Sequence, residues 1–136
     1  MATQRKSIVN SPEVAAPLKP HYSNAVRVSA GPLLFIAGQI ALDAQGRLVG
    51  KGDLRAQAVQ VLDNIRAILR AAGADMQDVL KVTVYVTDMR AFEELADIRL
   101  RYFPQDGPAS AIVEVSRLAL PDLMIEIEAV AAVPER

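Results

Sequence analysis

The stretch Gly107-Pro-Ala-Ser-Ala-Ile-Val-Glu-Val-Ser116, followed by Leu123-Met-Ile-Glu-Ile-Glu-Ala-Val130, indicates the fold of this chain. The first run follows a Gly-Pro break and is rich in branched apolar residues. In the second run, apolar residues alternate with Glu126 and Glu128, a period typical of a strand with one buried face. We therefore predict that two strands close the chain. On a solvated face such glutamates are ordinary, whereas a glutamate that lines a cleft can take part in chemistry.

Two amphipathic helices are predicted ahead of this strand pair. The first follows Asp53, a residue type suited to the N-cap, and its apolar residues recur at helical spacing as far as Leu69. The second begins after Thr87 or Asp88 and ends before Pro104. Its apolar face consists of Phe92, Leu95, Ile98 and Tyr102.

Further strands are predicted from composition and alternation. Residues 79–86 are dense in β-branched residues, which favours a central strand. Residues 25–29 and 33–37 flank Ala-Gly-Pro and predict a hairpin, and residues 40–42 predict a short strand. Residues 1–20 contain three prolines and no periodicity, so we expect an extended N-terminal segment.

This order of elements predicts a single α+β domain over residues 21–133. A mixed sheet would carry both helices on one face, as a two-layer sandwich. The apolar residues of the strands are too many to face the helices alone. The other face of the sheet must also be covered, which favours self-association.

Composition excludes several function classes. The net charge is −1 and no basic stripe is visible, which argues against a nucleic-acid binder. The chain has no cysteine and one histidine, so neither a thiolate nucleophile nor a His- or Cys-rich metal site is expected. The apolar runs are too short for a membrane span and no secretory signal is recognisable, so the cytoplasm is the expected location.

Each candidate site residue has an ordinary structural interpretation beside the functional one. His21-Tyr22 could supply a general base and a phenolic donor, or a solvated imidazole with an aromatic at the rim. Glu126 and Glu128 could be solvated strand residues. Arg99 and Arg101 are most simply solvated or interfacial charges. Gly50-Lys-Gly52 precedes a helix but matches no phosphate-binding motif, which favours a plain turn.

Several short motifs nevertheless occur in a recognisable order. They are Tyr22-Ser23, Leu34-Phe-Ile-Ala-Gly-Gln-Ile40, the helical segment 57–73 with Leu62-Asp-Asn-Ile65 and Ala71-Ala-Gly73, Val82-Thr-Val-Tyr-Val86, Phe103, Pro108-Ala-x-x-x-Val-Glu-Val115 and Ile125-Glu-Ile-Glu128. In this order they resemble the reactive-intermediate deaminases, the Rid or YjgF-like family. The resemblance extends over about residues 20–132.

The resemblance implies a chorismate-mutase-like fold and a homotrimer whose sheets form a central barrel, with clefts between neighbouring subunits. Members of the best-known branch hydrolyse the enamine and imine products of pyridoxal-phosphate enzymes to 2-oxo acids and ammonia, without a metal or cofactor. In their cleft an arginine binds the substrate carboxylate, a glutamate on the last strand positions water, and a tyrosine closes the pocket.

Carried over position by position, the resemblance is incomplete. Tyr22 matches the tyrosine and Glu126 the glutamate, which makes them the expected catalytic residues. Where the family signature reads Pro-Ala-Arg, this chain reads Pro108-Ala109-Ser110. The other positions that line the family cleft and differ here are Ala37, Ala96 and Ile112.

Loss of the arginine removes charge-assisted hydrogen bonds of about 1.5–3 kcal/mol each. The sequence therefore predicts a diverged imine or enamine hydrolase for a neutral, larger or aromatic substrate, with Glu126 orienting water and Tyr22 contacting the ligand. The alternative is a non-catalytic small-metabolite binder or sensor. The standard deamination of small 2-imino acids ranks below both.

Overall fold

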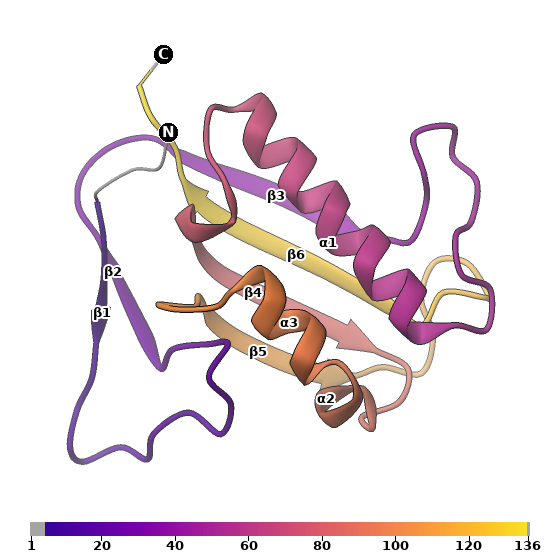
Figure 1. The fold of residues 1–136 in the computed structure, drawn as a ribbon, viewed down its shortest axis with the longest axis horizontal. Helices are drawn as coiled ribbons and strands as arrows, with labels where there is room; N and C mark the ends of the chain where they lie inside the picture. Colours follow the sequence, from indigo (N-terminus) through magenta and orange to yellow (C-terminus); the bar gives the residue numbers. More distant parts are fainter. Residues whose placement is uncertain (1–4, 136) are drawn as a thin grey trace.

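The computed structural model describes residues 5–135. They form a layer of helices packed on a four-stranded sheet, with a separate two-stranded ribbon (Figure 1). The four-stranded sheet has the order β3-β6-β4-β5. Strands β3, β6 and β4 are antiparallel, whereas β4 and β5 run parallel. Its strands are β3 (Leu33–Gln39), β4 (Val79–Val86), β5 (Ala109–Glu114) and β6 (Ile125–Ala132). The predicted mixed sheet with helices on one face is confirmed.

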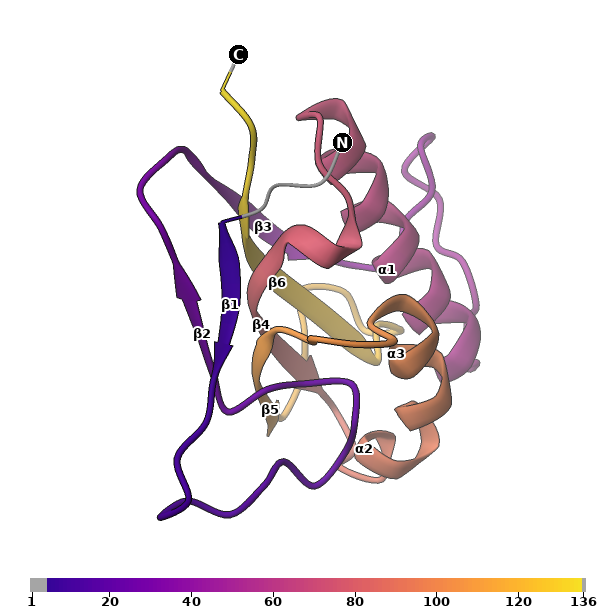
Figure 2. The same ribbon diagram turned by 60° about the vertical axis from the view of Figure 1, so that its left-hand side comes forward.

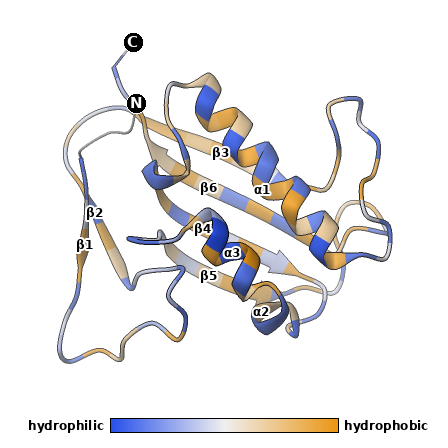
Figure 3. Cartoon of the chain, in the orientation of Figure 1, coloured by the Kyte–Doolittle hydropathy of each residue, from blue (hydrophilic) through white to orange (hydrophobic). Residues whose placement is uncertain are grey.

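Helix α1 (Leu54–Ala71) covers β3 and β6. The Asp53 side chain accepts the backbone N–H of Ala56, so the predicted N-cap is confirmed. The buried face of α1 includes Val61, Leu62, Ile65 and Leu69. This apolar stripe follows the helical period, and Figure 3 shows apolar residues of α1 alternating with polar ones along the helix.

The predicted second helix is divided into α2 (Ala91–Glu94) and α3 (Ala96–Tyr102). The break lies at Leu95, whose backbone has φ −102° and ψ 1° and whose side chain is buried. Helix α3 packs beside α1, and a short 3₁₀ turn, η1 (Met76–Asp78), leads into β4. The helices lie together on one side of the sheet (Figure 2).

The two faces of the sheet follow from strand register. Val82 of β4 pairs with Ala129 of β6 and Ser110 of β5, and these residues face the helices because Val82 is buried in the core. Tyr85 of β4 points to the opposite face of the sheet and pairs with Glu126 of β6 and Val113 of β5. We call the side that carries these last three residues the open face. It also bears Phe35, whose side chain is 75% exposed.

The predicted hairpin between residues 25–29 and 33–37 is wrong. Strand β2 (Ala25–Val28) pairs antiparallel with β1 (Lys6–Val9) and not with β3. The bend before β3 contains the guanidinium of Arg5, which donates to the carbonyls of Ser29, Pro32 and Val133. The ribbon stands at the end of the sheet where β4 and β5 begin (Figures 1 and 2).

Two smaller expectations also need correction. Residues 6–9 form a strand, so the N-terminal segment 1–20 is not irregular throughout; residues 1–4 lie outside the described part. Residues 40–42 form no strand but a turn, with an isolated bridge between Leu42 and Leu48. Lys6 holds β1 against the sheet by donating to the carbonyls of Gln77 and Val79.

Candidate functional site

Glu126 lies on the open face, on the inner strand β6. Its neighbour on β4 is Tyr85, and on the other side β3 is irregular between Ile36 and Gln39. The irregularity brings Gly38 against the glutamate: a Cβ at Gly38 would lie 2.0 Å from Glu126 Oε2. The absence of a side chain at Gly38 therefore provides the space that the carboxylate occupies.

The two glutamates of β6 differ in their contacts. Glu128 is exposed and accepts a 2.9 Å hydrogen bond from the Tyr85 hydroxyl, which raises the pKa of Tyr85. Glu126 is half-buried, and its carboxylate makes no hydrogen bond or ion pair with any residue in the range 5–135. Of the two, Glu126 is the one with a carboxylate available to a ligand or water.

Ser110 lies on the opposite, helix-covered face of the sheet. Arg99 of α3 donates a 2.8 Å hydrogen bond from Nη2 to Ser110 Oγ. Arg99 is only 3% exposed, and this burial lowers its pKa to about 10, which leaves it positively charged at neutral pH. The expectation that Arg99 is a solvated or interfacial charge is wrong for the single chain.

The position of Arg99 beside Ser110 in the same chain was not predicted from the sequence, although a signal was present. Leu95 lies four residues before Arg99, and Tyr102 three after it, and both belong to the predicted apolar face of the second helix. Residues at these spacings share one side of a helix. This spacing places Arg99 on the inward side of the helix, although it was predicted to be a solvated or interfacial charge.

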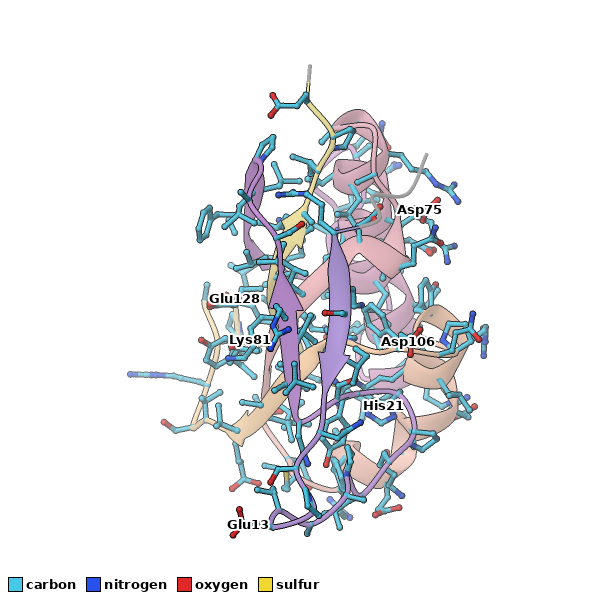
Figure 4. All side chains as sticks on the ribbon, turned by 90° about the vertical axis from the view of Figure 1, so that its left-hand side faces the viewer. Glu13, His21, Asp75, Lys81, Asp106 and Glu128 are labelled. Carbon is cyan, nitrogen blue, oxygen red and sulfur yellow. The ribbon has the colours of Figure 1, made fainter. Side chains whose placement is uncertain are left out.

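His21 is also buried, which corrects the interpretation of a solvated imidazole. Its side chain is 0% exposed and neither ring nitrogen has a hydrogen-bond partner in the described chain. Burial lowers its pKa to about 4, with further lowering by the charges of Arg99 and Lys19. The imidazole is therefore neutral at pH 7. Figure 4 shows His21 on the helix side of the molecule and Glu128 on the other side.

The backbone around His21 is fixed against the start of β5. Ser23 donates its N–H to the Pro108 carbonyl at 2.9 Å and its hydroxyl to the Gly107 carbonyl at 2.6 Å. A Cβ at Gly107 would lie 2.1 Å from the His21 carbonyl oxygen, so the two chain segments meet where a side chain has no room. We call residues 18–23 the cover segment.

Tyr22 belongs to the cover segment, beside His21. The ring centroids of the two residues are 5.5 Å apart, and the Tyr22 hydroxyl accepts the N–H of Leu18 at 2.9 Å. The Tyr22 hydroxyl also interacts electrostatically with Arg99. Tyr22, predicted to contact the ligand, is thus near Ser110 and Arg99 but not near Glu126.

The predicted cleft positions divide into two sets. Ala96 precedes Arg99 by one helical turn on α3, and Ile112 shares the helix-covered face with Ser110. Both belong with Tyr22 and Ser110. Ala37 is exposed on β3, next to Gly38, and belongs with Glu126. One chain therefore does not bring all six predicted residues together.

The described residues give no sign of a metal centre or a membrane helix. In residues 5–135, no group of three or more histidine, aspartate and glutamate side chains could hold a metal ion. Over the same range no helix is both long and apolar enough to cross a membrane.

Comparison with known proteins identifies the family. The model of the family described as endoribonuclease L-PSP matches residues 13–133. A RutC family protein of Pyrococcus horikoshii is 46% identical over 126 residues, which is 93% of this chain and 97% of that protein. The crystal structure of the Rid family protein YyfB from Yersinia pestis superposes with a TM-score of 0.89 at 35% identity, covering 96% of this chain and all of that one. The chain belongs to the Rid/YjgF family.

One Rid-family relative has an enzyme name. The protein from Dermatophagoides farinae called 2-iminobutanoate/2-iminopropanoate deaminase is 30% identical over 128 residues, covering 94% of this chain and 97% of its own length. The predicted family and its fold are thus confirmed, whereas the activity of this member has to be argued from its own site.

Proposed function

We propose that this Rid-family protein hydrolyses imines or enamines to carbonyl compounds and ammonia, in clefts formed between copies of the chain. The observation that supports this best is that the Glu126 carboxylate is half-buried and has no bonding partner in residues 5–135. It is held beside Gly38. A carboxylate in this condition can accept a proton from water at the moment of attack.

The reaction needs only proton transfers. Glu126 accepts a proton from water while the water oxygen bonds to the carbon of the C=N group. Glu126 returns this proton to the nitrogen, which holds the electron pair of the former C=N π bond. The hydroxyl proton then moves to the nitrogen, the C–N bond breaks with its electron pair going to nitrogen, and ammonia leaves as the C=O bond forms. An enamine enters the same sequence after protonation on carbon gives the imine. No oxidant, reductant or cofactor is required for this balance.

The division of the site residues favours a site between two copies. Tyr22 and Ser110 lie beside α3, whereas Glu126 points from the open face, and side chains on opposite faces of a sheet point away from each other. A small ligand that contacts both sets would bind where the open face of one copy meets the β5 edge of another. The predicted homotrimer would supply this junction.

The open face has the composition of a surface that is covered in an assembly. Leu33, Phe35 and Val113 are 42%, 75% and 41% exposed in the single chain. They lie at the two edges of the face, on β3 and β5, and large apolar side chains exposed on one face of a sheet often mark an interface. A trimer that buries this face is therefore part of the proposal.

The substrate preference predicted from sequence needs revision. A neutral substrate was expected because Ser110 replaces the family arginine. Arg99, however, places a guanidinium on the Ser110 hydroxyl, so the site does not lack a cation. A neutral substrate is therefore no longer favoured over an acid.

The test is a pair of matched substitutions on β6. A dehydratase that generates 2-aminoacrylate, with semicarbazide trapping, measures the rate at which the protein removes the imine. We expect Glu126→Gln to lose activity about 10²- to 10⁴-fold, the usual effect of a general base. Glu128→Gln, the same change two residues along the same face, should keep it. Equal activity of the two variants would refute the role of Glu126.

The alternative function, a non-catalytic metabolite binder or sensor, is decided by the same assay. It predicts that the wild-type protein consumes no imine from acids or from neutral aromatic amines while still binding a ligand. Light scattering tests the assembly independently: a monomer at micromolar concentration would contradict the proposed clefts.

A further inference from the structure

A cavity of about 260 Å³ lies between β1, the second half of α1, η1 and the loop that follows α3. Its lining includes three cations and two carboxylates, which are Lys6, Arg66, Arg101, Asp75 and Asp106. Within residues 5–135, the lining contains neither Arg99, His21 nor any of the predicted cleft residues. Figure 4 shows Asp75 and Asp106 on the helix side of the molecule, with Glu128 on the other side. The cavity is therefore separate from the site proposed for imine hydrolysis.

The guanidinium of Arg66 is held in place without the use of its hydrogen-bond donors. Its Cζ lies 4.7 Å from the centroid of the Tyr102 ring, and the Tyr102 hydroxyl donates a 2.7 Å hydrogen bond to Asp63. Arg66 Nε is 3.9 Å from Asp75 Oδ1, which is too far for a hydrogen bond. Within residues 5–135 no donor of the Arg66 side chain is bonded, and the buried Nε has no partner. Arg66 is thus oriented by an aromatic ring and still able to bind an anion.

Arg101 and Lys6 add positive charge from two other segments. Arg101 is exposed and forms no ion pair or hydrogen bond within residues 5–135. Burial and the hydrogen bond to Asp63 raise the pKa of Tyr102 to about 12, while the nearby charges of Arg66 and Arg101 lower it. Both guanidiniums therefore lie close to the same ring.

Lys6 reaches the cavity from the ribbon. It donates two of its three N–H groups to the carbonyls of Gln77 and Val79. Burial lowers the pKa of Lys6, and the carboxylate of Asp106 partly offsets this effect. Asp106 is therefore the lining carboxylate that compensates the charge of Lys6.

The other carboxylate, Asp75, is engaged elsewhere. It accepts hydrogen bonds from Arg70, which is outside the lining, and from the N–H of Met76. With Asp75 bonded to Arg70 and Asp106 close to Lys6, the two remaining arginines have no counter-charge of their own. Arg66 and Arg101 come from α1 and α3, so only the fold brings them to one cavity.

We infer that this cavity binds a phosphate group, either as the free ion or on a small molecule, with Arg66 and Arg101 as its main contacts. Phosphate carries a charge of about −1.5 to −2 at neutral pH and has three strong acceptor oxygens. Two guanidiniums with free donors match this charge, whereas a monoanion would compensate only one of them. The planar fork of arginine can bond two phosphate oxygens at once.

The size of the cavity limits what can be attached to the phosphate. Its volume equals the liquid volume of about nine water molecules, which leaves room for a short substituent. The Tyr102 ring is already covered by Arg66, so it offers no stacking surface for a base. A small phosphomonoester or inorganic phosphate therefore fits better than a nucleotide.

The experiment is a calorimetric titration with inorganic phosphate and with methyl phosphate in chloride buffer. We expect saturable binding with a dissociation constant of about 1 mM or lower. Arg66→Gln should weaken it about tenfold or more, the effect of losing one charge-assisted hydrogen bond. Arg117→Gln is the matched control, because it removes the same charge from an exposed residue outside the cavity. It should change the dissociation constant less than about twofold.

Asp106→Asn gives a prediction of the opposite sign. It removes a negative charge from the lining, and asparagine tolerates the positive φ of 49° at this position. Phosphate should bind about threefold more tightly or better, since like-charge repulsion is removed. Unchanged or weaker binding in this variant would contradict a phosphate beside Lys6 and Arg66.

Two further results would overturn the inference. They are the absence of saturable binding for both probes, and a loss in Arg66→Gln no larger than in Arg117→Gln. If Arg66→Gln does not fold, as judged by circular dichroism, Arg101→Gln replaces it and should weaken binding about fivefold or more. Equal affinity for the two probes would identify the free ion as the ligand, and clearly tighter binding of methyl phosphate would identify an ester. The titration contains no imine, so the phosphate site and the proposed hydrolysis stand or fail independently.

Discussion

The carboxylate of Glu126 occupies the space that a side chain at Gly38 would fill, since a Cβ there would lie 2.0 Å from Oε2 and 2.8 Å from Cδ. This relation links the irregular end of β3 to the predicted general base on β6. The Gly-Gln break in β3 is thus a structural requirement of the site, because any other residue at position 38 would move the carboxylate.

Substitution Gly38→Ala tests this relation. The new methyl group would push the flexible glutamate side chain aside without forcing the backbone into strain. Misplacing a reacting group by about 1 Å can lower a rate about 10²-fold. We expect a loss of imine hydrolysis of this order, measured with the trapping assay, and little change in melting temperature. Gly46→Ala is the control, because it has open space around it and should alter activity little despite its positive φ of 76°. Full activity in Gly38→Ala would contradict the assigned position of Glu126.

Substitution Gly107→Ala should dislodge the cover segment. Its Cβ would meet the His21 carbonyl oxygen at 2.1 Å and the Tyr22 Cα at 2.9 Å, both backbone atoms that cannot rotate away. Overpacking of this kind costs about 1–3 kcal/mol. Hydrogen exchange should show faster exchange at Ser23, whose N–H is bonded to Pro108 in the wild type, with protection of α1 unchanged. Unaltered exchange at Ser23 would refute the contact.

The buried His21 should make stability depend on pH. Its pKa is lowered to about 4 in the folded protein, against about 6.5 when unfolded. The unfolded chain therefore binds the proton more readily, and stability that is complete above pH 6.5 is lost as the pH falls toward 4. The shift corresponds to roughly 3 kcal/mol. Urea unfolding at pH 7 and pH 4.5 should show a smaller drop for His21→Gln than for the wild type. An equal drop would mean that His21 does not stay neutral in the fold.

Gln57 should contribute to stability through three hydrogen bonds. It is 0% exposed, donates to the carbonyls of Gly50 and Asp122 at 3.0 and 2.9 Å, and accepts the N–H of Met124 at 2.8 Å. It thereby ties the start of α1 to the segment that leads into β6. Gln57→Met removes the partner of the Asp122 carbonyl and of the Met124 N–H, whereas the Gly50 carbonyl still accepts the Asp53 N–H; each buried group left unpaired costs about 1–3 kcal/mol.

The measured quantity is the free energy of unfolding in urea. We expect Gln57→Met to lower it by about 2–4 kcal/mol. Gln60→Met is the matched control on the same helix, since within residues 5–135 the Gln60 side chain bonds only to the neighbouring Asn64 side chain. Similar values for the two variants would show that the Gln57 bonds are replaced without cost.

The elements of the main sheet and its helices follow from local patterns. The alternation from Ile125 to Glu128 and the helical spacing from Leu54 to Leu69 each lie within one segment, so hydrophobic periodicity is enough to predict them. The family motifs are equally local. The pairing of β2 was mispredicted because its partner, β1, lies in a segment without a strand signal, and because Arg5 from that segment donates into the bend where a hairpin was expected.

For the candidate site, too, some features could be predicted from the sequence and others could not. The sequence by itself determined the family and the sheet with its helices on one face, and the resemblance to the family singled out Glu126, Tyr22 and Ser110 as candidate site residues. Only the tertiary structure decided that Arg99 of α3 reaches Ser110, and that His21 lies buried beside it without a partner. The physical reason is that burial and electrostatic contact depend on segments that meet only after folding. A histidine or arginine has the same local pattern whether water or a protein interior surrounds it.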